Sequence, residues 1–289
     1  MDWIRGVQRL REQREAGVLV SVTEVTGHAP REAGAKMVVS ETRTWGSIGG
    51  GNLEAVAVDR ARSLIDTMRT RPVPPATFTS DLSDKAPAEH GVQCCGGRVT
   101  VLLEPLGVRP AVAIFGVGHV GTELARILAR HDLDLHLVDS RPEQIDAAAL
   151  TPLGDAVAAV HVHHEGVLPE LVLSRLPAGT HVLVMTHDHA EDIALCDAAL
   201  RATHLGPIGL IGSSAKWGRF RRRLVADGHE PSDVDRIVTP IGLPSLPGKE
   251  PAVIAVGVAA ALLASFAIAA PASAAEAEME SDAVDEPVR

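Results

Sequence analysis

The stretch AVAIFGVGHVGTELARIL, residues 111–128, decides the fold of the C-terminal part of the chain. Its apolar start runs into Gly116-x-Gly118-x-x-Gly121 and is followed by apolar residues at helical spacing, which predicts a strand, a glycine turn and a helix. The first glycine allows the turn, the second lets the backbone approach a phosphate, and the third lets the helix pack on the strand. The helix begins near His119 with free N–H groups, which favours a phosphate-bearing ligand.

An acidic residue lies at a suitable distance from this turn. Asp139 ends a second strand-like run, 18 residues beyond Gly121, about where a ribose-binding acid belongs. With NAD as the ligand, Asp139 would contact the ribose hydroxyls. The alternative is that the glycines only tighten a strand-to-helix turn in a domain that binds no nucleotide.

Composition limits the function classes. The 289 residues are enough for two domains, and 46% of them are hydrophobic, so a sizeable core can form. Aromatic residues make up only 2%, and the net charge is -10. A stacking platform for single-stranded nucleic acid and a general nucleic-acid binder are therefore both disfavoured.

The order of the predicted elements divides the chain into three parts. We expect an N-terminal α+β domain over residues 1–108, with the boundary marked by GVRP at 107–110. Strands and helices then alternate, which predicts a Rossmann-like, doubly wound parallel sheet over 109–270 and makes the fold class α/β. Residues 271–289 end in a strongly acidic stretch and are expected to form a disordered tail.

Cellular location is inferred from the cysteines and the apolar segments. Cys94, Cys95 and Cys196 have no spacing typical of a disulfide framework, and the N-terminus shows no secretory signal, so we expect a cytoplasmic protein. Residues 252–270 carry no charge but nearly half of them are alanine, which favours a buried helix over a membrane span.

A second glycine turn lies in the N-terminal part. Gly49, Gly50 and Gly51 open a predicted helix, so their N–H groups could bind an anion, with Ser47 and Asn52 as further hydrogen-bonding partners. An exposed Arg31 is expected in an earlier turn. No Lys-Ser/Thr pair follows the glycines, which excludes a Walker motif. A turn that binds no ligand is the alternative.

One thiol stands out among the candidate residues. Cys95 precedes Gly96 and Gly97 at the start of a predicted buried strand, so the deprotonated thiol could closely approach a metal or an electrophile. A small buried cysteine is the alternative, and Cys196, in a predicted helix, is expected in the core.

Two further loops follow predicted strands of the parallel sheet. In Thr186-His-Asp-His189 we expect His187 to face the ligand crevice, while Asp188 and His189 cap the next helix; the His-x-His pair as half of a metal site is the other reading. Lys216 follows a Gly-Ser-Ser turn at a helix start, a suitable place to neutralise a phosphate.

Taken together, these segments resemble the XdhC family, the accessory proteins of molybdenum hydroxylases such as xanthine dehydrogenase. They occur in the family's order and cover about residues 1–268. The matching segments are GHAPREAGAKMVVS (27–40), GSIGGGNLE (46–54), CGGRVTVLLEP (95–105), IFGVGHVG (114–121), THDHAEDIALC (186–196), IGLIGSSAKWGRF (208–220) and IGLPSLPGKEPAVIAVGVAAALL (241–263). The sequence departs from the family at 243–250, where LPSLPGKE replaces the usual aspartate-isoleucine-glycine-alanine pattern.

The resemblance implies a chaperone rather than an enzyme. Such a protein binds molybdenum cofactor (molybdopterin), supports its sulfuration by a cysteine desulfurase, inserts it into an apo-hydroxylase and acts as a homodimer. The cofactor's phosphates would rest on Gly49–Gly51 or Gly116–Gly121, with Cys95 near the molybdenum. The Rossmann site would leave room for a nucleotide.

Two other function classes compete with this chaperone. One is an NAD(P)-dependent oxidoreductase that uses the Rossmann domain, with His187 or Lys216 as the acid. The other is a redox-sensing regulator, ranked last because the sequence offers no element that reads DNA.

Overall fold

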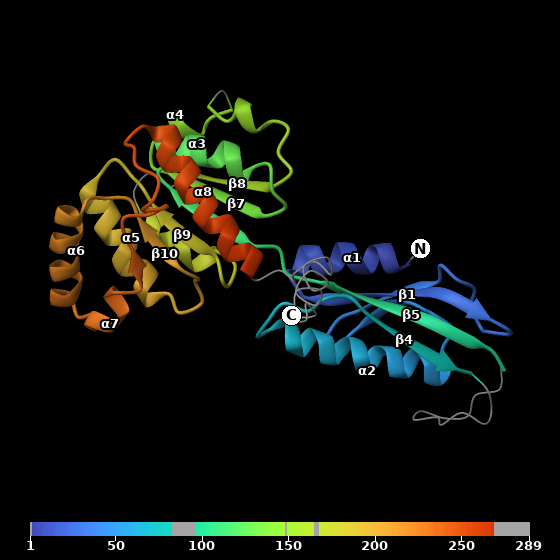
Figure 1. Ribbon diagram of the computed structural model, residues 1–289. Helices are drawn as coiled ribbons and strands as arrows, with labels where there is room; N and C mark the ends of the chain where they lie inside the picture. Colours follow the sequence, from blue (N-terminus) through green and yellow to red (C-terminus); the bar gives the residue numbers. More distant parts are fainter. Residues whose placement is uncertain (1, 83–95, 148, 165–167, 269–289) are drawn as a thin grey trace, which may run out of the picture. The chain divides into compact units, whose positions relative to one another are not determined.

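The computed structural model describes residues 2–82, 96–147, 149–164 and 168–268, which divide into two units (Figure 1). The first unit comprises the described residues up to Val108, and the second runs from Arg109 to Phe266. Cys94, Cys95 and the predicted acidic tail lie outside the described residues.

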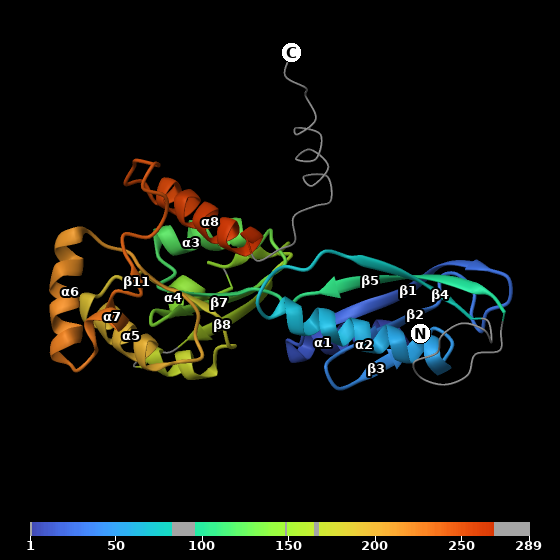
Figure 2. The same cartoon turned by 60° about the horizontal axis from the view of Figure 1, so that its bottom comes forward.

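The first unit is an antiparallel sheet with a helix packed on each face. Its described elements are α1 (Asp2–Gln13), β1 (Gly17–Thr26), β2 (Lys36–Val39), β3 (Thr44–Gly46), α2 (Gly51–Met68), β4 (Ala76–Asp81) and β5 (Arg98–Leu106). The strand order is β3-β2-β1-β5-β4. Figure 2 shows α2 lying along this sheet.

The core of the first unit follows from two apolar periodicities. Leu53, Ala57, Ala61 and Ile65 recur every fourth residue of α2 and are buried against alternate residues of the sheet, such as Val20. On the opposite face α1 approaches closely, because a Cβ added to its Gly6 would lie 2.9 Å from Trp45 Cβ.

The second unit is a parallel sheet of the Rossmann type. Its strands are β6 (Ala111–Phe115), β7 (Asp134–Asp139), β8 (Ala159–His164), β9 (His181–Val184), β10 (Ile208–Leu210) and β11 (Ile237–Val238), in the order β11-β10-β9-β6-β7-β8. Numbered from the first strand of the unit, this is the 3-2-1-4-5-6 order of dinucleotide-binding sheets. The predicted α/β fold class is confirmed.

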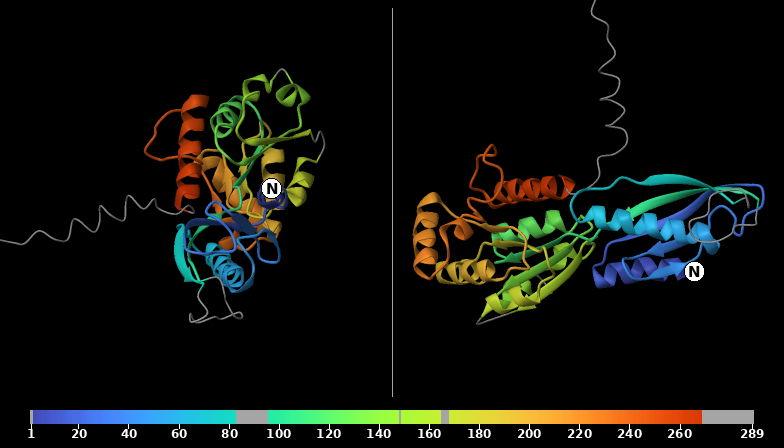
Figure 3. Two further views of the ribbon diagram at one scale, coloured as in Figure 1. Left: turned by 90° about the vertical axis from the view of Figure 1, so that its right-hand side faces the viewer. Right: turned by 90° about the horizontal axis from the view of Figure 1, so that it is seen from below.

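Helices cover both faces of the parallel sheet (Figures 1 and 3). On one face, α3 (His119–Leu128) and α8 (Pro251–Ile268) share a core with β6 and β7. On the other, η2 (Pro169–Arg175), α5 (His189–Arg201) and α6 (Ser214–Ala226) share a second core. Of the helices that the structure describes, none is long and apolar enough to cross a membrane.

The structure also differs from some of the predicted elements. After β7, where the predicted alternation calls for a helix, the structure has only α4 (Pro142–Ile145), followed by η1 (Thr151–Leu153). Asp146 explains the early end, because its carboxylate accepts a hydrogen bond from Ala149 N at 2.7 Å and so competes with helical bonding. Two very short elements, α7 (Pro231–Val234) and β11, were not expected from the sequence.

Candidate functional site

Three loops of the first unit converge at the end of its sheet. A Cβ on Gly49 would lie 2.5 Å from the Pro30 ring, and a Cβ on Gly97 would lie 2.2 Å from the His28 carbonyl oxygen. Only glycine permits so close an approach of Gly97 to the neighbouring backbone. The residues predicted to bind cofactor in this part of the chain are thus neighbours, coming from the 27–31, 47–52 and 96–97 segments. Cys95, just before Gly96, lies outside the described residues.

The glycine turn before α2 already holds an anion, which is the carboxylate of Glu54. Its Oε2 accepts hydrogen bonds from Ser47 Oγ at 2.5 Å, Ile48 N at 3.1 Å and Gly50 N at 3.1 Å. The N–H groups of Ile48 and Gly50 converge on one oxygen, as backbone N–H groups do in the anion sites that such turns form. In this structure, however, the chain's own side chain is the anion.

Other donors at this end of the unit remain open. Gly51 opens α2, whose first-turn N–H groups have no intrahelical acceptors, and its cap residue Gly50 supplies no side-chain hydrogen bond. A Cβ on Gly51 or Gly96 would meet nothing within 4 Å, so there is space around both. Arg31 is exposed and makes no hydrogen bond or ion pair with the described residues. These groups could receive a phosphate; Asn52 is buried beside them.

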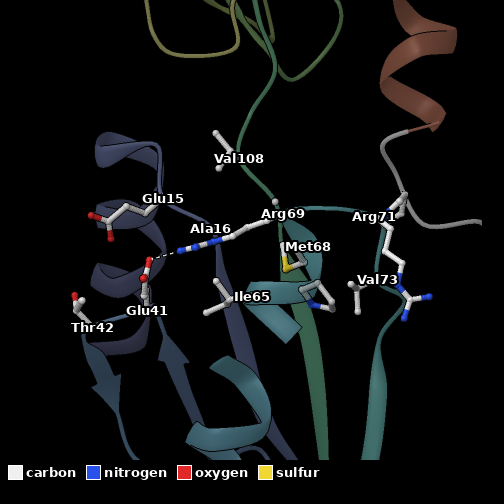
Figure 4. Close-up of a pocket in the computed structure, with 13 residues that line it drawn as sticks. Glu15, Ala16, Glu41, Thr42, Ile65, Met68, Arg69, Arg71, Val73 and Val108 are labelled. Atoms are coloured by element: carbon white, nitrogen blue, oxygen red, sulfur yellow. Dashed lines mark hydrogen bonds and ion pairs between the residues drawn. The ribbon is translucent and has the colours of Figure 1, made fainter. Parts of the chain in front are cut away.

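The opposite end of the same sheet carries a pocket (Figure 4). Gly17 pairs with Leu106 and Thr26 with Arg98, so β1 and β5 run the length of the sheet, about 30 Å. The cavity of about 590 Å³ is lined by residues from the Leu106 end, including Ile65, Met68, Arg69 and Val73. Arg69 extends across it and donates to Glu41 at 2.7 Å. None of the residues predicted to bind cofactor lines this pocket.

In the second unit the glycine turn forms as predicted. Gly116 has φ +99°, and a Cβ there would lie 2.4 Å from the Met185 carbonyl oxygen. A Cβ on Gly121 would lie 2.2 Å from the carbonyl oxygen of Gly116, which lets α3 start directly above β6. Gly118 differs, because only Arg141 Nη2 comes within 4 Å of its Cβ position. The space over Gly118 is therefore open, and His119 beside it is exposed.

Asp139 lies beside this turn, but its carboxylate is fully engaged. Oδ2 accepts from Val117 N at 2.7 Å and from Arg141 Nη2 at 2.9 Å, while Oδ1 accepts from Arg141 N and Arg141 Nε, both at 2.9 Å. Burial alone would raise the pKa of Asp139, but the hydrogen bonds and charge of Arg141, together with Val117 N–H, lower it below the ordinary value. Asp139 is thus ionised and ties β7 to the glycine turn.

Two carboxylates, Asp188 and Glu191, lie at the start of α5, next to the loop after β9. Asp188 caps α5 by accepting from Ala190 N at 2.7 Å, and His187 is exposed. Burial and the charge of Asp139 raise the pKa of Glu191, which accepts from Ser140 Oγ at 3.4 Å. Within the described ranges, no group of three or more His, Cys, Asp or Glu side chains could hold a metal ion.

Lys216 lies in the same region but is buried in an ion pair. Its Nζ donates to Asp192 Oδ2 at 2.5 Å and to the Ile211 carbonyl oxygen at 3.1 Å. Asp192 Oδ1 also accepts from Thr186 N at 3.0 Å and Thr186 Oγ1 at 2.8 Å. The pair therefore fastens the loop after β9 to the loop after β10. A phosphate at this place would compete with Asp192 for the ammonium group.

Cys196 lies in the core, as expected from the sequence, and provides a pH-dependent prediction. Burial raises the pKa of its thiol to about 12. Above about pH 9 the thiol ionises in the unfolded chain but not in the folded protein, so stability falls as pH rises. Its contribution should fall by about 1.4 kcal/mol per pH unit from pH 9 towards 12.

Urea titrations of the wild type and Cys196→Val at pH 8, 9 and 10.5 measure this contribution. The difference in the free energy of unfolding between the two proteins should change by about 2 kcal/mol between pH 9 and 10.5. If the free energies of unfolding of the two proteins change in parallel with pH, the thiol is not buried from solvent in the way that the structure places it.

Comparisons with known proteins identify both units. A family model described as the XdhC Rossmann domain matches residues 112–262, and one described as the XdhC and CoxI family matches residues 10–76. The uncharacterized protein YqeB of Escherichia coli (strain K12) is 23% identical over 255 residues, covering 88% of this chain and 44% of that protein. The chain thus spans less than half of this relative.

One of the solved structures that are similar is a crystal structure of a xanthine dehydrogenase from Bacillus halodurans. It is 20% identical, covers 91% of this chain and 95% of its own, and has a TM-score of 0.44. The Rossmann-domain model alone covers more than half of the 289 residues, and the second model precedes it in the chain. On these matches, the chain belongs to the XdhC family.

Proposed function

We propose that the protein is a maturation chaperone of a molybdenum hydroxylase such as xanthine dehydrogenase. It binds molybdenum cofactor as its cargo, supports sulfuration together with a cysteine desulfurase, and passes the cofactor to the apo-hydroxylase. Family membership supports the maturation role. The observation that carries the cofactor site is the convergence of Pro30, Gly49 and Gly97 at one end of the first unit.

The groups at this end suit a ligand that carries a phosphate and a metal. Arg31 and the open N–H group of Gly51 supply positive charge and a hydrogen-bond donor. Cys95 supplies a thiol next to Gly96, whose lack of a side chain leaves space around it. We assign Cys95 the place near the molybdenum and the other groups the phosphate. Ser47 is a positioning residue, because its hydroxyl is bonded to Glu54.

Cys95→Ala is expected to lower the molybdenum and pterin content of the purified protein at least about tenfold, because the metal would lose its thiolate ligand. The measurement is elemental and pterin analysis of full chains purified after coexpression with cofactor synthesis. Cys196→Ala is the matched control, because that thiol is buried in the second unit. Unchanged cofactor content in Cys95→Ala would contradict the role of Cys95.

The whole proposal has a separate test in cells. A strain that lacks the protein should accumulate hydroxylase without active cofactor, and the wild-type chain should restore it. Normal hydroxylase maturation without the protein, together with no pterin in the purified chain, would contradict the chaperone role.

A nucleotide in the second unit is the second part of the proposal. The 3-2-1-4-5-6 strand order and the close approaches at Gly116 and Gly121 support it, since dinucleotides bind where this order reverses, between β6 and β9. We expect binding without turnover. Substrate-dependent oxidation or reduction of the nucleotide would favour the oxidoreductase alternative, with exposed His187 as the acid in preference to buried Lys216.

A further inference from the structure

The carboxylate of Asp139, at the end of β7, has no acceptor position left for a ribose hydroxyl. An ionised carboxylate offers about four lone-pair positions. Asp139 fills four with Val117 N–H and three N–H groups of Arg141, and only 2% of the residue is exposed. The place that binds the ribose 2′- and 3′-hydroxyls in NAD-dependent Rossmann domains is therefore taken by the protein itself.

Arg141 is the group that faces the open side of the turn. Two of its side-chain donors, Nε–H and one Nη2–H, hold Asp139, and the rest of the guanidinium makes no hydrogen bond with the residues that the structure describes. Its Nη2 lies 3.8 Å from the Cβ position of Gly118, the glycine at which a phosphate approaches the backbone. The bonds to Asp139 fix the orientation of the guanidinium, and Asp139 and neighbouring carboxylates raise the pKa of Arg141, so it is always charged.

Two carboxylates besides Asp139 act on Arg141. Glu143 and Glu191 interact with it from α4 and α5. Burial and the charge of Asp139 raise the pKa of Glu191, whereas Glu143 is exposed to solvent, which screens its charge. Both act at longer range than a direct contact. A phosphate bonded directly to the guanidinium gains charge-assisted hydrogen bonds that exceed this screened repulsion.

We propose that the crevice of the second unit selects a nucleotide with a 2′-phosphate on its adenosine ribose, as in NADP(H), and that Arg141 reads this phosphate while Asp139 positions Arg141. The proposal rests on nucleotide binding by this unit. It replaces the expectation that Asp139 contacts the ribose of NAD.

Equilibrium binding of NADPH and NADH to the full chain tests the proposal. We expect NADPH to bind at least about tenfold more tightly, because the guanidinium contacts only the 2′-phosphate. Arg141→Ala should weaken NADPH at least about tenfold and leave NADH unchanged or tighter, since it frees an acceptor position on each oxygen of Asp139. The NADPH affinity of Arg141→Lys should lie between those of the wild type and Arg141→Ala, because lysine keeps the charge but lacks the paired donors of the guanidinium.

A matched control and a second ligand pair complete the test. Arg130→Ala removes an exposed arginine of the same unit, paired with Asp155, and should leave the NADPH to NADH ratio unchanged. Competition by 2′,5′-ADP should exceed that by 5′-ADP in the wild type only. Equal or tighter NADH binding in the wild type, or an unchanged ratio in a folded Arg141→Ala, overturns the proposal. No binding of either nucleotide overturns it together with the nucleotide part of the proposed function, and leaves the chaperone role standing.

Discussion

Lys216→Met is expected to lower the free energy of unfolding of the second unit by about 3–5 kcal/mol. The substitution leaves Asp192, which is 0% exposed, with a buried charge and, among the described residues, Thr186 as the one remaining donor to its carboxylate. Removing one partner of a buried pair costs more than removing both, because the remaining charge keeps its desolvation penalty. The double variant Lys216→Met/Asp192→Asn should therefore be more stable than Lys216→Met alone.

Urea unfolding followed by Trp217 fluorescence measures this effect in the unit concerned. Trp3 and Trp45 belong to the first unit and are replaced by Phe in the background, so the signal reports the second unit alone. Arg219→Met is the control, because this residue is an exposed cation of the same helix and should change stability by less than about 0.5 kcal/mol. A loss below 1 kcal/mol for Lys216→Met would argue against the buried pair.

Glu54→Ala has the second largest expected effect, because it should lower the free energy of unfolding of the first unit by about 2–3 kcal/mol. It leaves the hydroxyl of Ser47 and the N–H groups of Ile48 and Gly50 without their shared acceptor. The substitution leaves a space of the size of a carboxylate that is lined by these donors. Formate or acetate should therefore restore part of the lost stability. The melting temperature of Glu54→Ala should rise with formate concentration, whereas that of the wild type should not.

Glu12→Ala is the control for this experiment, because Glu12 is exposed in α1 and forms a solvent-exposed ion pair with Arg9 at 3.2 Å. It should change stability by less than about 1 kcal/mol and show no response to formate. If Glu54→Ala is as stable as the wild type, Glu54 does not fill the glycine turn in solution.

The fold was largely predictable from the sequence, and the reason is periodicity. The strand, turn and helix at 111–128 and the alternation that follows imply a parallel sheet, and the structure has one. The α6 helix begins at Ser214, at the helix start predicted from the Gly-Ser-Ser turn, because the Ser213 hydroxyl accepts a hydrogen bond from Lys216 N. Boundaries failed where local hydrogen bonds compete, as at Asp146.

The candidate sites were predictable only in part, because sequence motifs mark donors but not which acceptors reach them. The glycine turns were found, whereas Glu54 and Arg141 were missed. Both left a signal: an acid in the first turn of a helix tends to bond its free N–H groups, and an arginine two residues after an acid can pair with it. Lys216 was noticed, but its partner Asp192 is 24 residues away and is brought close only by the sheet.

The carboxylate of Glu54 also determines which dissolved anions can bind to the glycine turn. An intramolecular partner acts at an effective concentration far above that of any dissolved ion. Inorganic phosphate, sulfate or a free nucleotide that touches the turn through one anionic group alone cannot compete with it. A molecule that binds there must bring further contacts beyond its charge, so small dissolved anions are kept out of the turn, whereas the proposed cofactor, with its many polar groups, is not excluded on this ground.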